Sequence, residues 1–305
     1  MGGVERYPDG AFCWIDLGTT DVEGAKAFYG GLLGWEFEDL PAQEGSYTMC
    51  RLRGRDVAGI HRHAEEEGTG WNSNVSVSDL DRATARAREL GAEVLAEPFD
   101  VPGAGRTAVL RDPAGAVVSL WQAGGHAGAG LVNEVGAWNW NELVAPDLDL
   151  AKQFYGELFG WTADDVPGPI PRTSFSLGEL LVGGGHAPGP QEPPTPRWTV
   201  SFMVADADQT AAEAERFGGR VLLPPMDIPV GRFAVVADPA GGVHRRARAR
   251  RRSPGRRRVL APRPLSRRTP SRHTGSWWRA EIDQVLPGDR PLSSFSSASR
   301  RGRRG

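Results

Sequence analysis

Two carboxylates stand at the same place in two similar stretches of the sequence. Asp16 and Glu142 each come two residues after a tryptophan, Trp14 in one case and Trp140 in the other. In an extended strand, residues two apart point to the same face, so each carboxylate should lie beside an indole. An indole wall removes water from the carboxylate and favours the protonated form that a general acid needs. Asp16 and Glu142 are therefore our candidate catalytic residues.

A structural role is the alternative for both carboxylates. Each can accept hydrogen bonds or pair with an arginine, and carboxylates with perturbed protonation also arise in such pairs. Arg106 and Arg232 match across the two halves of the sequence and are the candidate partners. Both interpretations stay open at the level of the sequence.

The strands predicted around Asp16 separate an apolar face from a mixed aromatic and polar face. Ile15 and Leu17 alternate with Trp14 and Asp16, and later stretches alternate in the same way. The apolar face should pack against helices, whereas the mixed face suits an oriented small-molecule site. Plain sheet surface or a domain interface is the alternative interpretation. The candidate ligand-binding residues are Trp14, Asn72, Asn74, Ser119, Trp121 and Arg106.

The stretches around the two carboxylates are copies of one sequence unit. With an offset of 126, residues 12–35 align with residues 138–161, and both contain the triplet Phe-Tyr-Gly. The turn Asp-Pro-Ala-Gly at residues 112–115 recurs at residues 238–241. A period of this length suits a duplicated domain rather than a solenoid.

Each copy contains the pattern of two β-α-β-β-β units. In the first copy, alternation over residues 12–18 predicts a strand, and apolar residues at helical spacing from Val22 to Leu32 predict a helix. Three short strands bounded by turn residues follow, and a second unit begins near Asn72. The sequence therefore predicts an α+β protein of two tandem domains, each of two such units.

The predicted domains occupy residues 8–122 and 135–242, joined by a glycine-rich, flexible linker at residues 123–134. In the second copy the apolar closing strand gives way, after Gly242, to arginine, proline and serine. We therefore expect the second domain to lack its closing strand. Residues 243–305 are predicted to be disordered or to be translated out of frame, with a solubilising extension or a nucleic-acid arm as alternatives.

Charge divides the chain at the same point. Residues 243–305 hold 19 arginines and three acidic residues, which leaves 17 basic and 35 acidic residues in the remainder. The arginine runs lack interleaved aromatic residues, so nucleic acid is not an expected partner. Two cysteines, Cys13 and Cys50, do not make a disulfide framework, and no apolar run approaches the length of a membrane span. The expected location is the cytoplasm, with no membrane partner.

The unit order, the Phe-Tyr-Gly helix and the Asp-Pro-Ala-Gly hairpin together resemble the vicinal oxygen chelate superfamily. That superfamily includes glyoxalase I, extradiol dioxygenases, and fosfomycin and bleomycin resistance proteins. The tandem form is similar to actinobacterial proteins that include accessory proteins of anthracycline tailoring. The resemblance covers roughly residues 8–242. It implies cup-shaped sheets with helices outside and a ligand inside.

Catalytic members of this superfamily hold a divalent metal through His, Gln or Glu at set strand positions. The matching positions here do not carry those residue types, so we expect no metal and no cofactor. The pair His61 and His63, followed by Glu65–Glu67, is an alternative metal site, although solvated loop histidines are favoured. The residues at the matching positions are Trp14, Trp140, Asn72, Thr199, Ser119, Ala58 and Val182.

The resemblance and the residues together favour a metal-independent small-molecule-binding or tailoring protein of secondary metabolism. The indoles at Trp14, Trp71 and Trp121 indicate a flat, aromatic or polyketide-like ligand. A tailoring oxygenase is a further expected partner. A metal-dependent lyase or dioxygenase of the glyoxalase type is one alternative function, and a drug-sequestering resistance protein is another.

Overall fold

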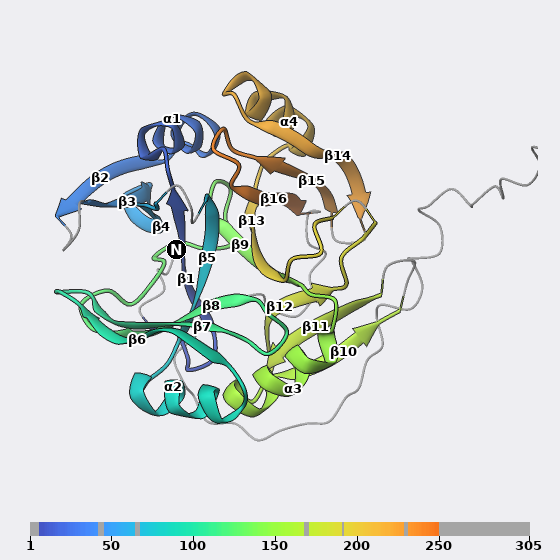
Figure 1. Cartoon of the computed structure of the whole chain (residues 1–305). Helices are drawn as coiled ribbons and strands as arrows, with labels where there is room; N and C mark the ends of the chain where they lie inside the picture. Colours follow the sequence, from blue (N-terminus) through green and yellow to red (C-terminus); the bar gives the residue numbers. More distant parts are fainter. Residues whose placement is uncertain are drawn as a thin grey trace, which may run out of the picture.

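The computed structural model describes residues 6–249, apart from 42–45, 65–67, 168–170, 191 and 229–230, and only the backbone of residues 244–249. The chain forms two eight-stranded mixed sheets with two helices each (Figure 1). This confirms the α+β fold and the tandem arrangement of two domains. The predicted tail from residue 250 onward lies outside the described residues.

The first sheet has the strand order β2-β3-β4-β1-β5-β8-β7-β6. Its two β-α-β-β-β units meet in the antiparallel pair β1–β5, where Asp16 lies opposite Asn72. Each unit closes by a parallel pair, β1 with β4 and β5 with β8. The elements are β1 Phe12–Thr19, α1 Val22–Leu33, β2 Glu36–Pro41, β3 Ser46–Leu52, β4 Arg55–Arg62, β5 Gly70–Ser76, α2 Leu80–Glu89, β6 Glu93–Val101, β7 Gly105–Arg111 and β8 Val117–Ala123.

The second sheet repeats this topology in the order β10-β11-β12-β9-β13-β16-β15-β14. Its central antiparallel pair is β9–β13, and Glu142 lies opposite Thr199. The elements are β9 Trp138–Val144, α3 Leu148–Phe159, β10 Thr162–Val166, β11 Arg172–Leu177, β12 Leu180–His186, β13 Arg197–Met203, α4 Ala207–Arg216, β14 Arg220–Ile228, β15 Gly231–Ala237 and β16 Val243–Ala249.

Strand β16 corrects the expectation that the second domain lacks its closing strand. Its backbone pairs antiparallel with β15 and parallel with β13, as β8 does in the first sheet. Strand pairing uses backbone groups that every residue except proline supplies, and Val243–Ala249 contains no proline. The change to arginine-rich sequence therefore does not prevent the strand from forming.

Each helix in the described residues begins at an aspartate that follows a strand. Asp21, Asp79, Asp147 and Asp206 each accept a hydrogen bond from a backbone N–H of the first turn. Aspartate is a favoured residue at this position because it satisfies an amide that has no partner within the helix. The same turn thus directs each helix onto one side of its sheet.

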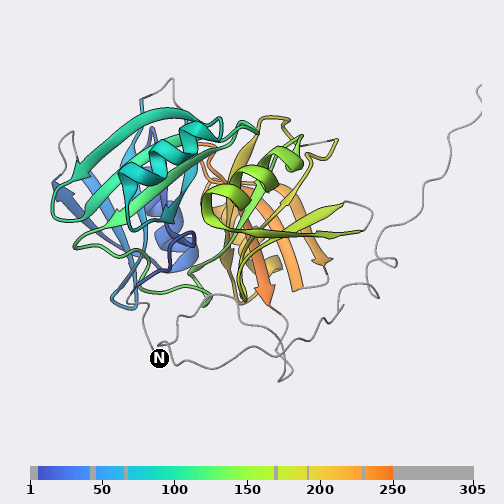
Figure 2. The same ribbon diagram turned by 90° about the horizontal axis from the view of Figure 1, so that it is seen from below.

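The two domains pack through their central strands and their helices. Strand β5 contacts β13, α1 lies beside α4, and α2 lies beside α3 (Figures 1 and 2). Aromatic rings cross the boundary in both directions. Phe202 of β13 contacts Tyr29, Trp35 and Trp71, and Phe12 of β1 contacts Trp161 and Trp198.

The segment expected to be a flexible linker is packed against the first domain. Ala129 is fully buried, its N–H donates to Cys13 O, and its carbonyl accepts a hydrogen bond from the Tyr7 hydroxyl. Gly130 N donates to Asp56 O. Small residues here allow close approach of the two backbones. None of the helices in the described parts of the chain is both long and apolar enough to span a membrane.

Candidate functional site

The first cup is the face of the first sheet that carries Trp14, Asp16, Asn72 and Asn74. Asn74 Nδ2 donates to Asp16 Oδ2 at 3.2 Å, and Asn72 Nδ2 donates to Ser119 Oγ at 2.9 Å. Four predicted site residues from β1, β5 and β8 are therefore joined by hydrogen bonds. Their shared face follows from the strand register that places Asp16 opposite Asn72 and Asn74 beside Ser119.

Tyr47 of β3 completes the wall beside Asp16. The Trp14 Nε1–H donates to the Tyr47 hydroxyl at 2.8 Å. A side chain at Gly59, the β4 residue opposite Asp16, would collide with that hydroxyl. Burial, and secondarily the negative charge of Asp16, raises the pKa of Tyr47 well above its ordinary value. Tyr47 is therefore a neutral hydroxyl next to the Asp16 carboxylate.

His61 lies near the end of β4, opposite Gly18 of β1, and His63 follows just after the strand. Their rings meet edge to face with 4.9 Å between centroids, and the His61 ring stacks on Tyr47 at 6.1 Å. The His63 ring occupies the space over Gly18, where a side chain would collide with it. His61 thus belongs to β4 and to the wall of the first cup, whereas His63 lies in the loop just after the strand and covers Gly18. Glu65–Glu67, which follow them, lie outside the described residues.

Three polar atoms of this wall are buried without a hydrogen-bond partner in the described parts of the chain. They are Asp16 Oδ1, His61 Nδ1 and Asn72 Oδ1, from three adjacent strands. Leaving such an atom unsatisfied costs about 1–3 kcal/mol, and more when the group is charged. A cluster of three is therefore a place where a ligand can supply the missing hydrogen bonds.

The linker covers the part of the first cup that carries Trp14 and Trp121. The His126 ring meets Trp14 edge to face with 4.5 Å between centroids, and its carbonyl accepts a hydrogen bond from Trp121 Nε1. Burial lowers the pKa of His126, so its ring is biased toward the neutral form. Its Nε2 is another buried atom with no partner among residues the structure describes. Trp14 and Trp121, both predicted ligand-binding residues, are thus brought together with a histidine that was not predicted.

Arg106 is not part of the first cup, which corrects its assignment as a ligand-binding residue. Its guanidinium pairs with Asp81 of α2 at 2.6 Å and with Asp100 of β6 at 3.2 Å. Arg232 pairs with Asp208 of α4 in the same way. The side chain points to the helix side of the sheet because strand alternation puts Arg106 opposite Gln122, on the other face from Trp121. Arg106 and Arg232 are therefore not the partners of Asp16 and Glu142.

The corresponding face of the second sheet, the second cup, holds Glu142 in a network of its own side chains. Arg172 Nη1 donates to Glu142 Oε1 at 2.7 Å, and His186 Nδ1 lies 3.0 Å from the same oxygen. Trp140 Nε1 donates to Oε2 at 2.7 Å. His186 Nε2 lies 3.0 Å from Glu192 Oε2. A buried carboxylate needs such compensation because desolvation of its charge is costly.

The sequence carried a signal for Tyr47, Arg172 and His186, which were not among the predicted site residues. Tyr47 lies opposite His61, and Arg172 lies opposite His186, so the two pairs correspond in the repeat with an offset of 125. The segment that leads to these strands is one residue shorter in the second copy. The offset of 126, which aligns residues 12–35 with residues 138–161, therefore does not align the two pairs. His126 has no such signal because it lies in the linker.

The two domains match known family models. Residues 13–121 match the glyoxalase-like domain, and residues 137–243 match the Glyoxalase/Bleomycin resistance protein/Dioxygenase superfamily. CFP32 of Mycobacterium tuberculosis, named as a candidate glyoxylase, is 40% identical over 253 residues, 78% of this chain and 94% of the relative. The chain belongs to the glyoxalase/bleomycin resistance/dioxygenase superfamily. The predicted resemblance is thereby confirmed.

Other relatives of the chain are named as anthracycline biosynthesis proteins. The anthracycline biosynthesis protein DnrV of Streptomyces peucetius is 34% identical over 259 residues, which cover 78% of this chain and 93% of DnrV. Among solved structures, the Mn(II)-bound glyoxalase of Novosphingobium aromaticivorans is 18% identical and has a TM-score of 0.56, with 79% and 82% of the two chains covered. The latter likeness shows the fold alone.

The residues present do not fit the metal that catalytic members of the superfamily carry. The Trp14 indole donates its N–H to Tyr47, and an indole has no lone pair to offer a metal. The Asn72 amide nitrogen donates to Ser119 Oγ, and neither residue offers the imidazole or carboxylate that the superfamily uses at these positions. In the described ranges, no group of three or more His, Cys, Asp or Glu side chains is arranged to hold a metal ion.

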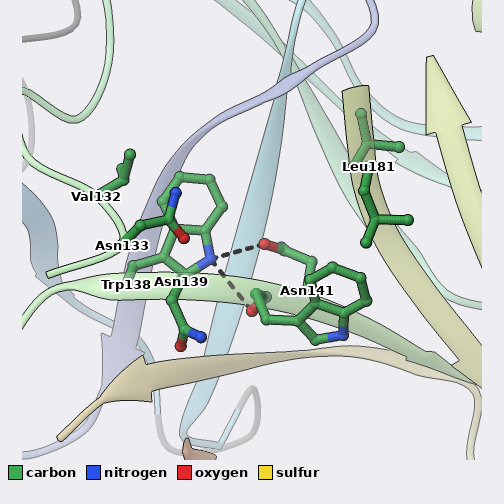
Figure 3. Close-up of a pocket in the computed structure, with 8 residues that line it drawn as sticks. Val132, Asn133, Trp138, Asn139, Asn141 and Leu181 are labelled. Carbon is green, nitrogen blue, oxygen red and sulfur yellow. Dashed lines mark hydrogen bonds between the residues drawn. The ribbon is translucent and has the colours of Figure 1, made fainter. Parts of the chain in front are cut away.

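A separate hollow opens beside the tryptophans of β9 (Figure 3). Its cavity volume is only about 10 Å³, and the Trp138 indole N–H donates to Asn141 Oδ1 at 2.7 Å on one side of it. Asn139 Oδ1 is buried there without a partner in the described part of the chain. The lining contains none of the predicted ligand-binding residues: it consists of Val132, Asn133, Trp138, Asn139, Trp140, Asn141, Leu181 and Val182.

Proposed function

We propose that the first cup binds a small organic molecule at Asp16, His61 and Asn72, and that the protein acts on or carries an aromatic polyketide-like compound. The observation that carries this proposal is the set of three buried polar atoms without partners in the described residues, on one face of three adjacent strands. A ligand that donates to Asp16 Oδ1 and Asn72 Oδ1 would satisfy two of them. Trp14, Tyr47 and Trp121 provide apolar walls for its ring.

The names of the relatives support the class of compound. DnrV and DauV, both 33–34% identical, are named anthracycline biosynthesis proteins, and anthracyclines are flat aromatic compounds. We include metal independence in the proposal, because the positions that hold the metal elsewhere in the superfamily carry Trp14, Asn72 and Ser119 here. A tailoring oxygenase remains a proposed partner.

Asp16 and His61 are the proposed acid–base groups if the bound molecule is transformed. Asp16 Oδ1 can accept a proton, and His61 Nδ1 can donate or accept one according to its tautomer. Both lie on the same wall, on the neighbouring strands β1 and β4, and the Tyr47 ring of β3 stacks on the His61 ring. Glu142 is a weaker catalytic candidate, because both of its oxygens already accept hydrogen bonds from Arg172, His186 or Trp140.

The proposal is tested by titrating the protein with an anthracycline and following tryptophan fluorescence. His61→Leu keeps most of the ring volume but removes the nitrogens, and should weaken binding about tenfold or more. Asp164→Asn, an exposed change on β10, is the matched control and should bind like the wild type. Equal affinity in the His61 variant, with an unchanged circular dichroism spectrum, would exclude this cup as the site.

Binding and turnover are separated in the same experiment. Product formation that disappears in Asp16→Asn at ligand concentrations that saturate the variant would assign Asp16 the role of an acid or base. Tight binding without product would favour the drug-sequestering alternative. If the purified protein holds stoichiometric metal, and a chelator that removes the metal abolishes ligand binding, the glyoxalase-type alternative is favoured.

A further inference from the structure

The two cups place corresponding residues around corresponding carboxylates. Asp16 lies opposite Gly59, and Glu142 lies opposite Gly184. Tyr47 lies opposite His61, and Arg172 lies opposite His186. The strand register therefore identifies Tyr47 of the first cup as the counterpart of Arg172 in the second.

In the second cup the protein itself neutralises the carboxylate. The Arg172 guanidinium lies 2.7 Å from Glu142 Oε1, where it makes a charge-assisted hydrogen bond. The Trp140 indole N–H and the His186 ring bond the same carboxylate. Glu142 is only 6% exposed, so this compensation takes place largely out of water.

In the first cup the corresponding cation is replaced by a phenol. Tyr47 stands where Arg172 stands, and the Trp14 N–H donates to the Tyr47 hydroxyl rather than to Asp16. Aspartate is also one methylene shorter than glutamate, so the carboxylate stays further from the imidazole. The neutral Asn74 amide donates to Asp16 Oδ2, and Asp16 Oδ1 is buried without a hydrogen-bond partner among residues the structure describes.

We propose that the ligand of the first cup carries a cationic amine that pairs with Asp16 Oδ1, in the place that the Arg172 guanidinium takes in the second cup. This inference rests on the proposed function, because it assumes that the first cup is the ligand site. The rings of Trp14 and Tyr47 beside the carboxylate add a favourable environment for an ammonium group. The ligand class is therefore an aromatic compound with an amine substituent.

Two pairs of probes, each an amine and a neutral analogue, measure how much the ligand's positive charge contributes to binding. One is an anthracycline glycoside with a free amine and its N-acetyl derivative, and the other is 2-phenylethylamine and 2-phenylethanol. Calorimetric titration of the full chain should show about tenfold or greater preference for the amine in each pair, as expected for a charge-assisted hydrogen bond. Asp16→Asn keeps the shape but removes the charge, and should abolish that preference.

A second variant copies the second cup into the first. Asp16→Glu combined with Tyr47→Arg gives the protein its own cation, which should exclude the amine and lower its affinity to that of the neutral probe. The melting temperature checks that the variant is folded, and Asp16→Asn decides the question if it is not.

The outcomes distinguish the inference from the proposed function. Amine preference that depends on Asp16 supports the inference. Equal affinity for the amine and the neutral probe, both weakened by His61→Leu, overturns the inference and leaves the proposed function intact. Affinity for all four probes that is unchanged by Asp16→Asn and by His61→Leu overturns both.

Discussion

Tyr29 of α1, in the first domain, donates its hydroxyl hydrogen bond to Asp238 Oδ2 of the second domain at 2.9 Å. The relationship is reciprocal, because Tyr155 of α3 donates to Asp112 Oδ2 of the first domain at 2.6 Å. Both tyrosines are fully buried, and each accepts a hydrogen bond from an indole, Trp71 or Trp198. The repeated helix and the repeated hairpin thus join the two domains rather than forming the ligand site.

Removal of either tyrosine hydroxyl should destabilise the protein. Tyr155→Phe leaves Asp112 Oδ2 and Trp198 Nε1 buried without this partner, at a cost of about 1–3 kcal/mol in the free energy of unfolding. Tyr29→Phe should cost a similar amount for the same reason. Urea unfolding followed by fluorescence measures both. A loss below about 0.3 kcal/mol in both variants would show that these bonds do not stabilise the interface.

The same interface predicts a pH dependence. Burial raises the pKa of Asp112 and of Asp238 above the ordinary value, although hydrogen bonds from tyrosine and backbone N–H groups oppose the shift. A carboxyl whose pKa is raised on folding contributes most below the unfolded value of about 3.9, and loses that contribution as pH rises through its folded pKa. The free energy of unfolding of the wild type, relative to Asp112→Asn/Asp238→Asn, should therefore fall as pH rises above about 4. A relative gain over this range would contradict the sign.

The aromatic rings that cross the boundary should be among the most costly to truncate. Phe202 is fully buried against Tyr29, Trp35 and Trp71, so Phe202→Ala should lower the free energy of unfolding by about 3–5 kcal/mol. Phe99→Ala is the matched control, because Phe99 is 47% exposed and should cost much less. Thermal unfolding of the two variants side by side measures the difference, and equal losses would refute it.

The position of β16 predicts where truncation from the C-terminus begins to lower the melting temperature. A chain that ends at Gly242 lacks the strand between β13 and β15, so its second sheet is divided and backbone groups on both neighbours lose their partners. Its melting temperature should fall well below that of a chain that ends at Ala249, which keeps the strand. Identical melting curves for the two chains would mean that β16 does not stabilise the second domain.

The local pattern of the sequence determined the units of the fold and one face of the site. Alternation in β1 and β5 placed Trp14, Asp16 and Asn74 on one face, because side chains alternate with a period of two whatever the strand packs against. The repeat likewise predicted a duplicated domain, since copies of a sequence fold alike.

Tertiary structure decided which groups meet across long distances in the chain. Arg106 forms an ion pair with Asp81 on the helix side, and Arg172 forms one with Glu142. The Tyr29 hydroxyl donates a hydrogen bond to Asp238, 209 residues away. Strand alternation gives the direction of a side chain but not its partner, which depends on how separate elements pack and which charge is nearest. Strand β16 formed in spite of its sequence, because its pairing uses the backbone.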